Sequence, residues 1–356
     1  MTERKLKIGI VGAGFFGQIA HIANYAQLES CHIVGLAQLR SDVREQVARK
    51  FSIPATYETH HELLANSDAE AIVVVTSRPA LGPIVLDCLH AGKHVLSEKP
   101  MAGSAELAER LVAAADANNV KYVVGYMKRH DAGVQTARRL LDELRHSNEL
   151  GPITYVRAHC FAGDAYCGQQ DYIATTQPRS GGLARWPMAP TWLPHEHHAA
   201  YEKYLNTYCH NINLLRYLIA NEAAVVQAHA VGSTCLATLD LAGIPALLET
   251  GRLEHADWDE VTEIFFERGR LRIATPAPLR RDAAAKVELY RGQLGSWEPI
   301  EIAPSWAFRR QAEAFVADVQ HDRAPIASAR DAVNDLRLTE SIWRKLLTTQ
   351  LLEVDE

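Results

Sequence analysis

The sequence predicts an α/β protein in which a parallel sheet domain is followed by an α+β domain with a large open, mainly antiparallel sheet. Three observations lead to this prediction. An apolar run at residues 6–11 leads directly into a glycine-rich turn. Apolar runs then alternate with helix-compatible segments as far as residue 125, which is typical of a parallel sheet with crossover helices. Polar and apolar residues alternate over residues 223–273, as in antiparallel strands.

The glycine-rich turn has the spacing of a dinucleotide-binding loop. Gly12, Gly14 and Gly17 form a G-x-G-x-x-G pattern between the first strand and a helix predicted over residues 18–28. Gly12 allows the tight turn, Gly14 lets the backbone approach a pyrophosphate, and Gly17 lets the helix pack closely on the strand. Free N–H groups at the start of the helix favour phosphate binding. The pattern predicts a Rossmann domain whose cofactor site also includes two loop residues, Phe15 and Phe16.

The second predicted strand, residues 32–39, ends without the acidic residue that usually binds the adenosine ribose. Gln38 holds that place, and Arg40 and Ser41 follow it. A glutamine does not repel a 2′-phosphate, and an arginine can pair with one. Because a glutamine can also hydrogen-bond a ribose hydroxyl, the sequence is compatible with NAD as well as NADP. The predicted cofactor is therefore NAD(P)(H), with a slight preference for NADP.

Two further strand ends carry polar residues. Thr76 and Ser77 follow the third apolar run, and Glu98 and Lys99 follow the next one. Ligands of open α/β sheets bind at the carboxyl ends of strands, so we expect these residues to border the cofactor. Pro100 biases Lys99 toward an extended backbone at this position.

The regular alternation of strand and helix stops after residue 125, so we divide the chain into domains at residues 1–125 and 126–356. The C-terminal helices of the second domain can pack back on the first. Other helices are predicted at residues 42–51, 84–90, 131–144, 196–219, 306–321 and 331–347. We also predict a strand at residues 154–161, a loop rich in Pro and Gly at residues 177–194, and a hairpin turn at residues 267–270.

Composition limits the classes of partner and location. The net charge is −6 and no long basic run occurs, which argues against nucleic-acid binding. No apolar run approaches the ~20 residues that span a bilayer, and the apolar residues near the N-terminus are needed for the first strand. The six cysteines are widely spread without a C-x-x-C pair, which is typical of reduced thiols. We therefore expect a cytoplasmic protein with no membrane partner.

Histidines cluster at two places, and neither predicts a metal site. The run from His195 to His198 is not an H-E-x-x-H helix, because its fifth position is Ala199. His60 and His61 precede a short helix and are expected at the surface. No metal is therefore expected.

A more specific signal lies at Lys93-His94-Val95-Leu96-Ser97-Glu98-Lys99-Pro100-Met101, downstream of the glycine loop. This segment resembles the Gfo/Idh/MocA oxidoreductase family, the relatives of glucose–fructose oxidoreductase and inositol dehydrogenase. The resemblance covers nearly the whole chain, including residues 125–129, the helix at residues 206–218 and the closing segments at residues 313–315, 331–332 and 340–341. It implies a second domain whose open sheet often forms an oligomer interface, and a cleft that holds nicotinamide and substrate. A homo-oligomer, dimer or tetramer, is expected.

The resemblance also implies catalytic residues. The catalytic lysine of the family maps onto Lys99, and the histidine of its D-x-G-x-H-x-x-D helix maps onto His210. This chain departs from that pattern, with Asn206, Tyr208 and Asn213 at the first Asp, the Gly and the second Asp. Asn206 shares a helix face with His210 but cannot carry charge or relay a proton. Without a carboxylate nearby, His210 is expected to be neutral near pH 7.

Hydride transfer at a carbon that bears a hydroxyl needs a group that takes or gives the hydroxyl proton. Lys99 suits this role if burial and neighbouring charges lower its pKa from ~10.4 toward neutrality. We therefore predict an NAD(P)-dependent oxidoreductase that acts on a small polyhydroxylated substrate: a sugar, amino sugar, sugar nucleotide or cyclitol. Substrate contacts, each with a structural alternative, are expected from Tyr126, Lys128, His159, Trp192 and Tyr208.

Two other functions stay open. Some relatives oxidise and re-reduce the same sugar, so that the net reaction is glycosidic cleavage or epimerisation without net redox change. A cofactor-binding regulator without turnover is the other possibility, and only the change at Asn206 favours it. An intact Lys99 favours the oxidoreductase.

Overall fold

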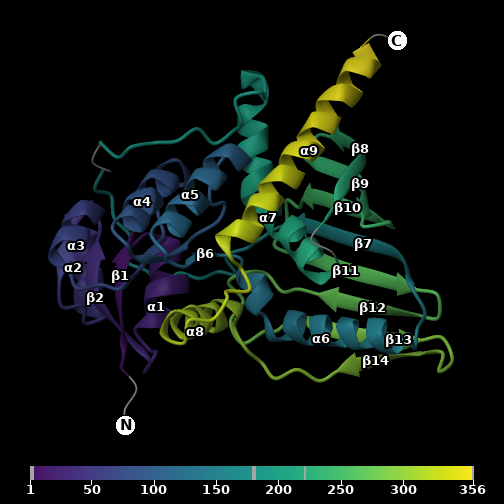
Figure 1. Ribbon diagram of the computed structural model, residues 1–356, viewed down its shortest axis with the longest axis horizontal. Coiled ribbons are helices and arrows are strands. Elements are labelled where there is room, and N and C mark those ends of the chain that lie inside the picture. Colours follow the sequence, from purple (N-terminus) through teal and green to yellow (C-terminus); the bar gives the residue numbers. More distant parts are fainter. Residues whose placement is uncertain (1–3, 179–181, 220–221, 355–356) are drawn as a thin grey trace. The chain divides into compact units, whose positions relative to one another are not determined.

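The computed structural model describes residues 4–178, 182–219 and 222–354 (Figure 1). These residues form two compact units. The first contains the chain up to Tyr126 together with residues 170–202 and 308–333, and the second contains residues 127–169, 203–307 and the chain from residue 334. The division differs from a single boundary after residue 125, because the chain returns to the first unit twice.

A parallel sheet of six strands forms the centre of the first unit, in the order β3-β2-β1-β4-β5-β6. All neighbouring strands pair in parallel, as the sequence predicts. The winding direction reverses between β1 and β4, which is where open α/β sheets bind ligands. The strands are β1 Leu6–Val11, β2 Cys31–Ala37, β3 Thr56–Tyr57, β4 Ala71–Val74, β5 His94–Ser97 and β6 Tyr122–Val124.

Helices connect these strands. They are the π-helical turn η1 Gly17–Ile22, α1 Ala23–Tyr25, α2 Ser41–Lys50, α3 His60–Asn66, α4 Arg78–His90 and α5 Ala105–Ala117. The first unit also contains most of α8 Ala307–Gln320, which follows the second sheet in the chain. The first helical segment ends at Tyr25, three residues before its predicted end at residue 28.

The prediction for α4 is wrong at its start, which lies at Arg78 and not at residue 84. Pro79 lies in the first turn, where no N–H needs an intrahelical partner. Pro83 lies inside the helix and lacks the N–H that would bond to the carbonyl of Pro79. The N–H of Trp186 donates to that carbonyl at 2.8 Å instead. Trp186 therefore supplies the hydrogen bond that Pro83 cannot donate to the carbonyl of Pro79.

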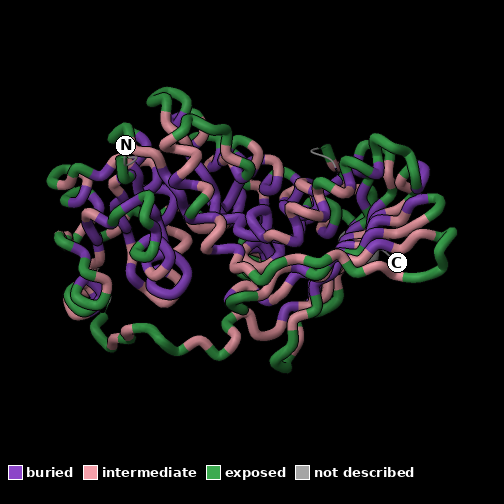
Figure 2. Tube along the Cα trace, turned by 90° about the horizontal axis from the view of Figure 1, so that it is seen from below, coloured by how far each residue is buried: buried purple, intermediate pink, exposed green. Residues whose placement is uncertain are grey.

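The second unit is built on an eight-stranded sheet in the order β14-β13-β12-β11-β7-β10-β9-β8. Only β7 and β10 pair in parallel, so the prediction of a mainly antiparallel sheet is confirmed. Buried and exposed residues alternate along β9, because one face of the sheet is covered (Figure 2). The strands are β7 Ile153–Ala162, β8 Ala224–Val231, β9 Thr234–Leu241, β10 Ile244–Arg252, β11 Trp258–Phe266, β12 Gly269–Ala274, β13 Lys286–Arg291 and β14 Ser296–Ile300.

The remaining helices are η2 Met127–His130, α6 Ala132–Ser147, η3 His195–His197, α7 His198–Leu218 and α9 Ala329–Val354. The predicted hairpin turn joins β11 to β12. The sequence analysis did not identify β13 and β14, and it ended α9 seven residues too early, at residue 347.

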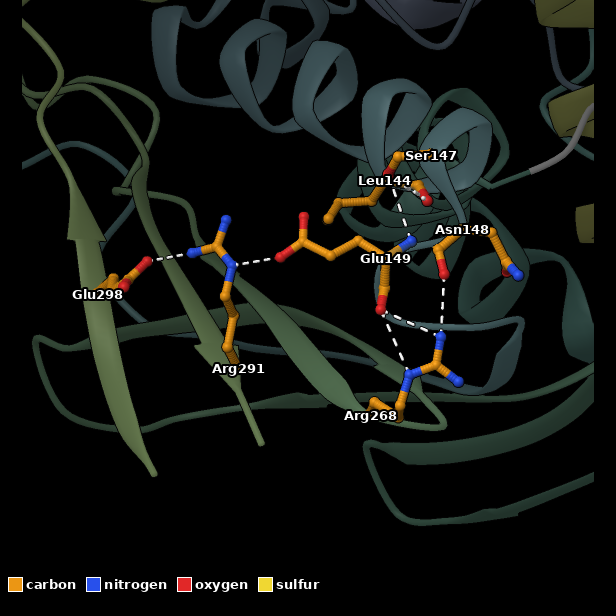
Figure 3. Close-up of polar contacts among 7 residues, drawn as sticks. All are labelled: Leu144, Ser147, Asn148, Glu149, Arg268, Arg291 and Glu298. Atoms are coloured by element: carbon orange, nitrogen blue, oxygen red, sulfur yellow. Dashed lines mark hydrogen bonds and ion pairs between the residues drawn. The ribbon is translucent and has the colours of Figure 1, made fainter. Parts of the chain in front are cut away.

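Charged side chains fix the end of α6 to the sheet of the same unit (Figure 3). Asn148 ends the helix in a left-handed conformation with φ of +53°. Arg268 donates to the backbone carbonyls of Asn148 at 3.0 Å and Glu149 at 3.1 Å. The Glu149 carboxylate accepts from Nε of Arg291 at 2.6 Å, and Arg291 also pairs with Glu298. These contacts join α6 to β13 and β14.

In the part of the chain that the structure describes, no helix has the length and apolar character needed to cross a membrane. All six cysteines lie in that part, and none forms a disulfide. Burial raises the pKa of the Cys31 and Cys235 thiols to about 11. Both are therefore protonated at neutral pH.

Candidate functional site

The loop between β1 and η1 has the geometry predicted for its turn and its helix packing. Gly12 has φ of +99°, and a Cβ there would overlap the carbonyl oxygen of Val75. A Cβ on Gly17 would lie 2.5 Å from the carbonyl oxygen of Gly12. A Cβ on Gly14 would meet no atom within 4 Å, so the fold itself does not require that glycine. The open space beside Gly14 fits a backbone kept clear for a ligand.

Three neighbouring strands bring the candidate residues of the first unit to one edge of its sheet. The glycine loop follows β1, Thr76 and Ser77 follow β4, and Glu98 and Lys99 follow β5. Because the strands are parallel, their carboxyl ends meet at the same edge. Ser77 is the N-cap residue of α4 without a side-chain capping bond. The structure confirms that these three segments lie at the same edge of the sheet.

The carboxyl end of β2 carries two arginines near Gln38. The Gln38 N–H donates to the carbonyl of Tyr57 at 3.0 Å, and Arg44 donates to the carbonyl of Gln38 at 2.7 Å. The Gln38 amide oxygen lies 3.5 Å from the N–H of Arg40. Among the described residues, no carboxylate pairs with the guanidinium of Arg40. A guanidinium without a carboxylate partner is able to pair with a phosphate group.

A buried hydrogen bond supports the Glu98-Lys99 segment. The Nε2 atom of His21, on η1, donates to the Glu98 carboxylate at 2.8 Å, and the side chain of His21 is only 3% exposed. The same carboxylate accepts from the backbone N–H of Lys99 at 3.1 Å. Burial acts to raise the pKa of Glu98, but the hydrogen bond and charge of His21 lower it overall. Glu98 therefore stays ionised and fixes the backbone of Lys99, whose side chain is half-buried.

His21 is a site residue that the sequence analysis missed. Its position in the segment after the glycine loop was visible, but only the fold brings it to Glu98, 77 residues later.

Two predicted substrate residues also belong to the first unit. Tyr126 is 2% exposed, and Trp192 is half-buried in the loop before α7.

In the second unit, α7 carries Asn206, Tyr208 and His210. Asn206 is half-buried and His210 is 7% exposed, and the two lie one helical turn apart. The Tyr208 hydroxyl donates to the carbonyl of Gly251 in β10 at 2.7 Å, and burial raises its pKa far above its usual value. This bond gives Tyr208 a structural role in holding α7 on the sheet.

Lys128, a predicted substrate residue, lies in a buried ion pair with Glu260. The two side chains are 6% and 2% exposed. The Glu260 carboxylate also accepts from Nδ2 of Asn211 at 2.6 Å and from Nε1 of Trp258 at 3.0 Å. The sequence analysis missed Glu260. It lies on β11 two residues before Thr262, and both side chains are buried on the same face of the sheet. A charged residue at a position expected to face inward could have indicated a buried ion pair.

A second buried network involves Asn213, which stands where the D-x-G-x-H-x-x-D pattern has its last aspartate. Its Oδ1 accepts from Nε of Arg129 at 2.7 Å, and its Nδ2 donates to Asp335 at 2.7 Å. Asp335, from α9, also pairs with Arg216 at 2.5 Å. The Asn213 amide is therefore part of a buried network that includes the Asp335 carboxylate of α9.

The structure does not bring His159 to the candidate residues of α7. Its Nε2 atom lies 2.9 Å from Asp259, at a partly exposed position of β7. The next residue, Cys160, is buried and pairs in register with Glu260, which contacts α7 through Asn211. Because successive side chains of a strand point to opposite faces, His159 lies on the sheet face away from α7.

One cluster in the described part of the chain could hold a metal ion: His60, His61 and Asp87. His60 is 5% exposed, which corrects its expected place at the surface. Its Nε2 lies 2.9 Å from Asp87, and its Nδ1 is buried without a hydrogen-bond partner. A metal at Nε2 would put a proton on Nδ1, where no acceptor lies, whereas metal-bound histidines usually donate that proton. We therefore interpret the cluster as a contact that joins α3 to α4.

A cavity of about 520 Å³ lies in the first unit at the amino ends of the strands. Leu6, Ala69 and His94 line it together with charged residues such as Arg4 and Glu70. This edge of the sheet is opposite to the glycine loop. The cavity is therefore separate from the candidate cofactor site.

Comparison with known proteins agrees with this geometry. Residues 6–126 match the oxidoreductase family with an NAD-binding Rossmann fold, GFO_IDH_MocA. Inositol 2-dehydrogenase of Pseudomonas fluorescens is 28% identical over 342 residues, which cover 92% of this chain and 90% of that protein. Inositol 2-dehydrogenase/D-chiro-inositol 3-dehydrogenase of Shouchella clausii is 33% identical over 141 residues, or 39% of this chain and 40% of that protein.

Solved structures share the fold over nearly the full length. A 3-ketoreductase from Actinomadura kijaniata in complex with NADP and TDP-benzene has a TM-score of 0.74 at 19% identity, covering 96% of this chain and 98% of that one. Aldose-aldose oxidoreductase from Caulobacter crescentus has a TM-score of 0.75 at 21% identity, covering 97% and 98%. Residues 6–126 thus resemble the Gfo/Idh/MocA oxidoreductase family, and the solved structures show that the shared fold extends over nearly the whole chain.

Proposed function

We propose that this protein is an NAD(P)-dependent oxidoreductase that transfers a hydride between nicotinamide and a hydroxyl or keto carbon of a cyclitol or sugar. The observation that carries the proposal is the edge of the first sheet, where the glycine loop, Thr76 and Lys99 follow three neighbouring strands. Relatives named inositol 2-dehydrogenase support a cyclitol as the first substrate class to test.

Lys99 is the acid/base of this proposal. During oxidation its amine takes the hydroxyl proton as the hydride leaves the carbon, and during reduction its ammonium returns the proton to the oxygen. The Glu98 carboxylate, held by His21, fixes the backbone of Lys99 next to β5. His210 is proposed to orient the reacting oxygen. Asn206 supports this through hydrogen bonding alone, because an amide does not relay a proton.

The nicotinamide chemistry belongs to the bound cofactor, and the chain supplies its binding groups. The N–H groups at the start of η1 and the loop residues Phe15 and Phe16 would hold the pyrophosphate. Gln38 and Arg40 would hold the adenosine ribose, with a preference for a 2′-phosphate. A homo-oligomer formed through the open sheet of the second unit, and a cytoplasmic location, complete the proposal.

Arg40→Ala is expected to weaken NADPH binding about 10- to 100-fold and to leave NADH binding within about twofold. The reason is the loss of one charge-assisted bond to the 2′-phosphate, worth about 1.5–3 kcal/mol. Fluorescence titration with each dinucleotide measures both constants. Arg49→Ala, at an exposed position of α2, the helix that begins directly after Arg40, is the control.

Equal or tighter NADH binding by the unmodified protein would contradict the preference for NADP and leave Gln38 as a plain ribose contact. Binding of neither dinucleotide would overturn the proposed function.

A further inference from the structure

Residues 170–178, here called the strap, lie in the first unit although they follow β7 of the second. One end of the strap is bound at the glycine loop. Gln18, 2% exposed, pairs its amide with the backbone of Ile173: its Oε1 accepts from the N–H at 2.7 Å, and its Nε2 donates to the carbonyl at 3.0 Å. The same Nε2 donates to the carbonyl of Ala13 at 2.9 Å. The ring of Tyr172 packs edge-on against Phe15, with centroids 4.9 Å apart.

The other end of the strap is bound at the start of α2. The Thr175 hydroxyl donates to the Asp42 carboxylate and accepts from the N–H of Gln177 at 2.9 Å. The Gln177 amide accepts from the N–H of Asp42 and donates to the hydroxyl of Ser41, both at 3.4 Å. These groups come directly after Arg40, so they border the place proposed for the adenosine ribose.

The strap thus joins the two loops that hold the pyrophosphate and the adenosine ribose in a dinucleotide-binding fold. We infer that the strap is a third wall on the adenosine side of the cofactor site, and that it must lift before the dinucleotide enters or leaves. The inference rests on the proposed function for the dinucleotide itself. It adds a chain segment that controls how long the cofactor stays bound.

The contacts of the strap suit a wall that opens. Residues 170–178 form no helix or strand, so lifting them breaks no ladder of backbone bonds. The bonds at Thr175 and Gln177 are few, and both residues lie near the surface. Several such bonds slow opening without preventing it.

The test is the rate at which bound NADPH leaves the full-length protein. Release is followed by stopped-flow fluorescence on mixing the NADPH complex with excess NADP⁺. Thr175→Val keeps the shape of the side chain and removes the hydroxyl that binds Asp42. We expect release to be about 5- to 10-fold faster, which corresponds to the loss of one such bond. Gln177→Ala should also speed release.

Thr176→Val is the matched control, because Thr176 is exposed and the structure gives it no side-chain bond within the described residues. Its release rate should stay within about twofold of the unmodified protein. Unchanged rates in both Thr175→Val and Gln177→Ala, in a protein that does bind NADPH, would overturn the role of the strap alone. A protein that binds neither NADPH nor NADH would overturn the proposed function and this inference together.

Discussion

Lys99→Met is expected to lower kcat about 10²- to 10⁴-fold while dinucleotide affinity changes only a few-fold. Methionine matches the length of lysine but carries no group that takes or gives a proton, and general acid–base catalysis contributes factors of this size. The fold should be retained, because the Glu98 carboxylate binds the backbone N–H at position 99, which methionine also provides. Steady-state kinetics with the best polyol, together with a dinucleotide titration, separates the two effects.

Lys93→Met is the matched control, because Lys93 lies at the amino end of the same strand and lines the opposite edge of the sheet. Its kcat should equal that of the unmodified protein. A Lys99→Met protein that retains more than about a tenth of the rate would exclude Lys99 as the acid/base, since general acid–base catalysis contributes at least ~10²-fold.

Glu260→Gln is expected to lower the free energy of unfolding by about 3–5 kcal/mol. The substitution leaves the buried ammonium of Lys128 without its carboxylate, and an uncompensated buried charge has a cost of this size. An amide also has only one accepting atom, so it cannot serve both Asn211 and Trp258 as the carboxylate does. Denaturant unfolding followed by a signal from the second unit measures the change.

Glu263→Gln on the same strand is the control for that measurement. Glu263 pairs with Arg270 at 3.8 Å, and the two side chains are 17% and 36% exposed. A pair in such a position contributes about 0–1 kcal/mol. If both variants lose the same small amount, the buried pair at Glu260 does not stabilise the second unit as argued here.

Local sequence patterns were enough to predict most of the fold. A single strand–turn–helix unit specifies the positions of Gly12 and Gly17, and their geometry in the structure agrees with the prediction. The alternation of polar and apolar residues over residues 223–273 predicted antiparallel strands, since it indicates that one face of a sheet is buried. These features depend on residues close together in the sequence.

The parts that could not be predicted depend on partners distant in the chain. The start of α4 requires Trp186 to bond the carbonyl of Pro79, which Pro83 leaves without its usual donor. The support of Glu98 requires His21. The pairing of Lys128 with Glu260 spans 132 residues, and it converts a predicted substrate contact into part of a buried network. No periodicity or motif encodes such pairs.

The central claim, net hydride transfer to nicotinamide, is tested most directly by mixing the purified protein with NADP⁺ or NAD⁺ and a panel of polyols that includes myo-inositol and common aldoses. The absorbance of reduced nicotinamide is followed together with the amount of product. We expect reduced nicotinamide to accumulate in equal amount to a keto or lactone product. Product without any accumulation of reduced nicotinamide would contradict the claim in favour of a reaction without net redox change, and bound dinucleotide with no product from any polyol would contradict it in favour of a regulator.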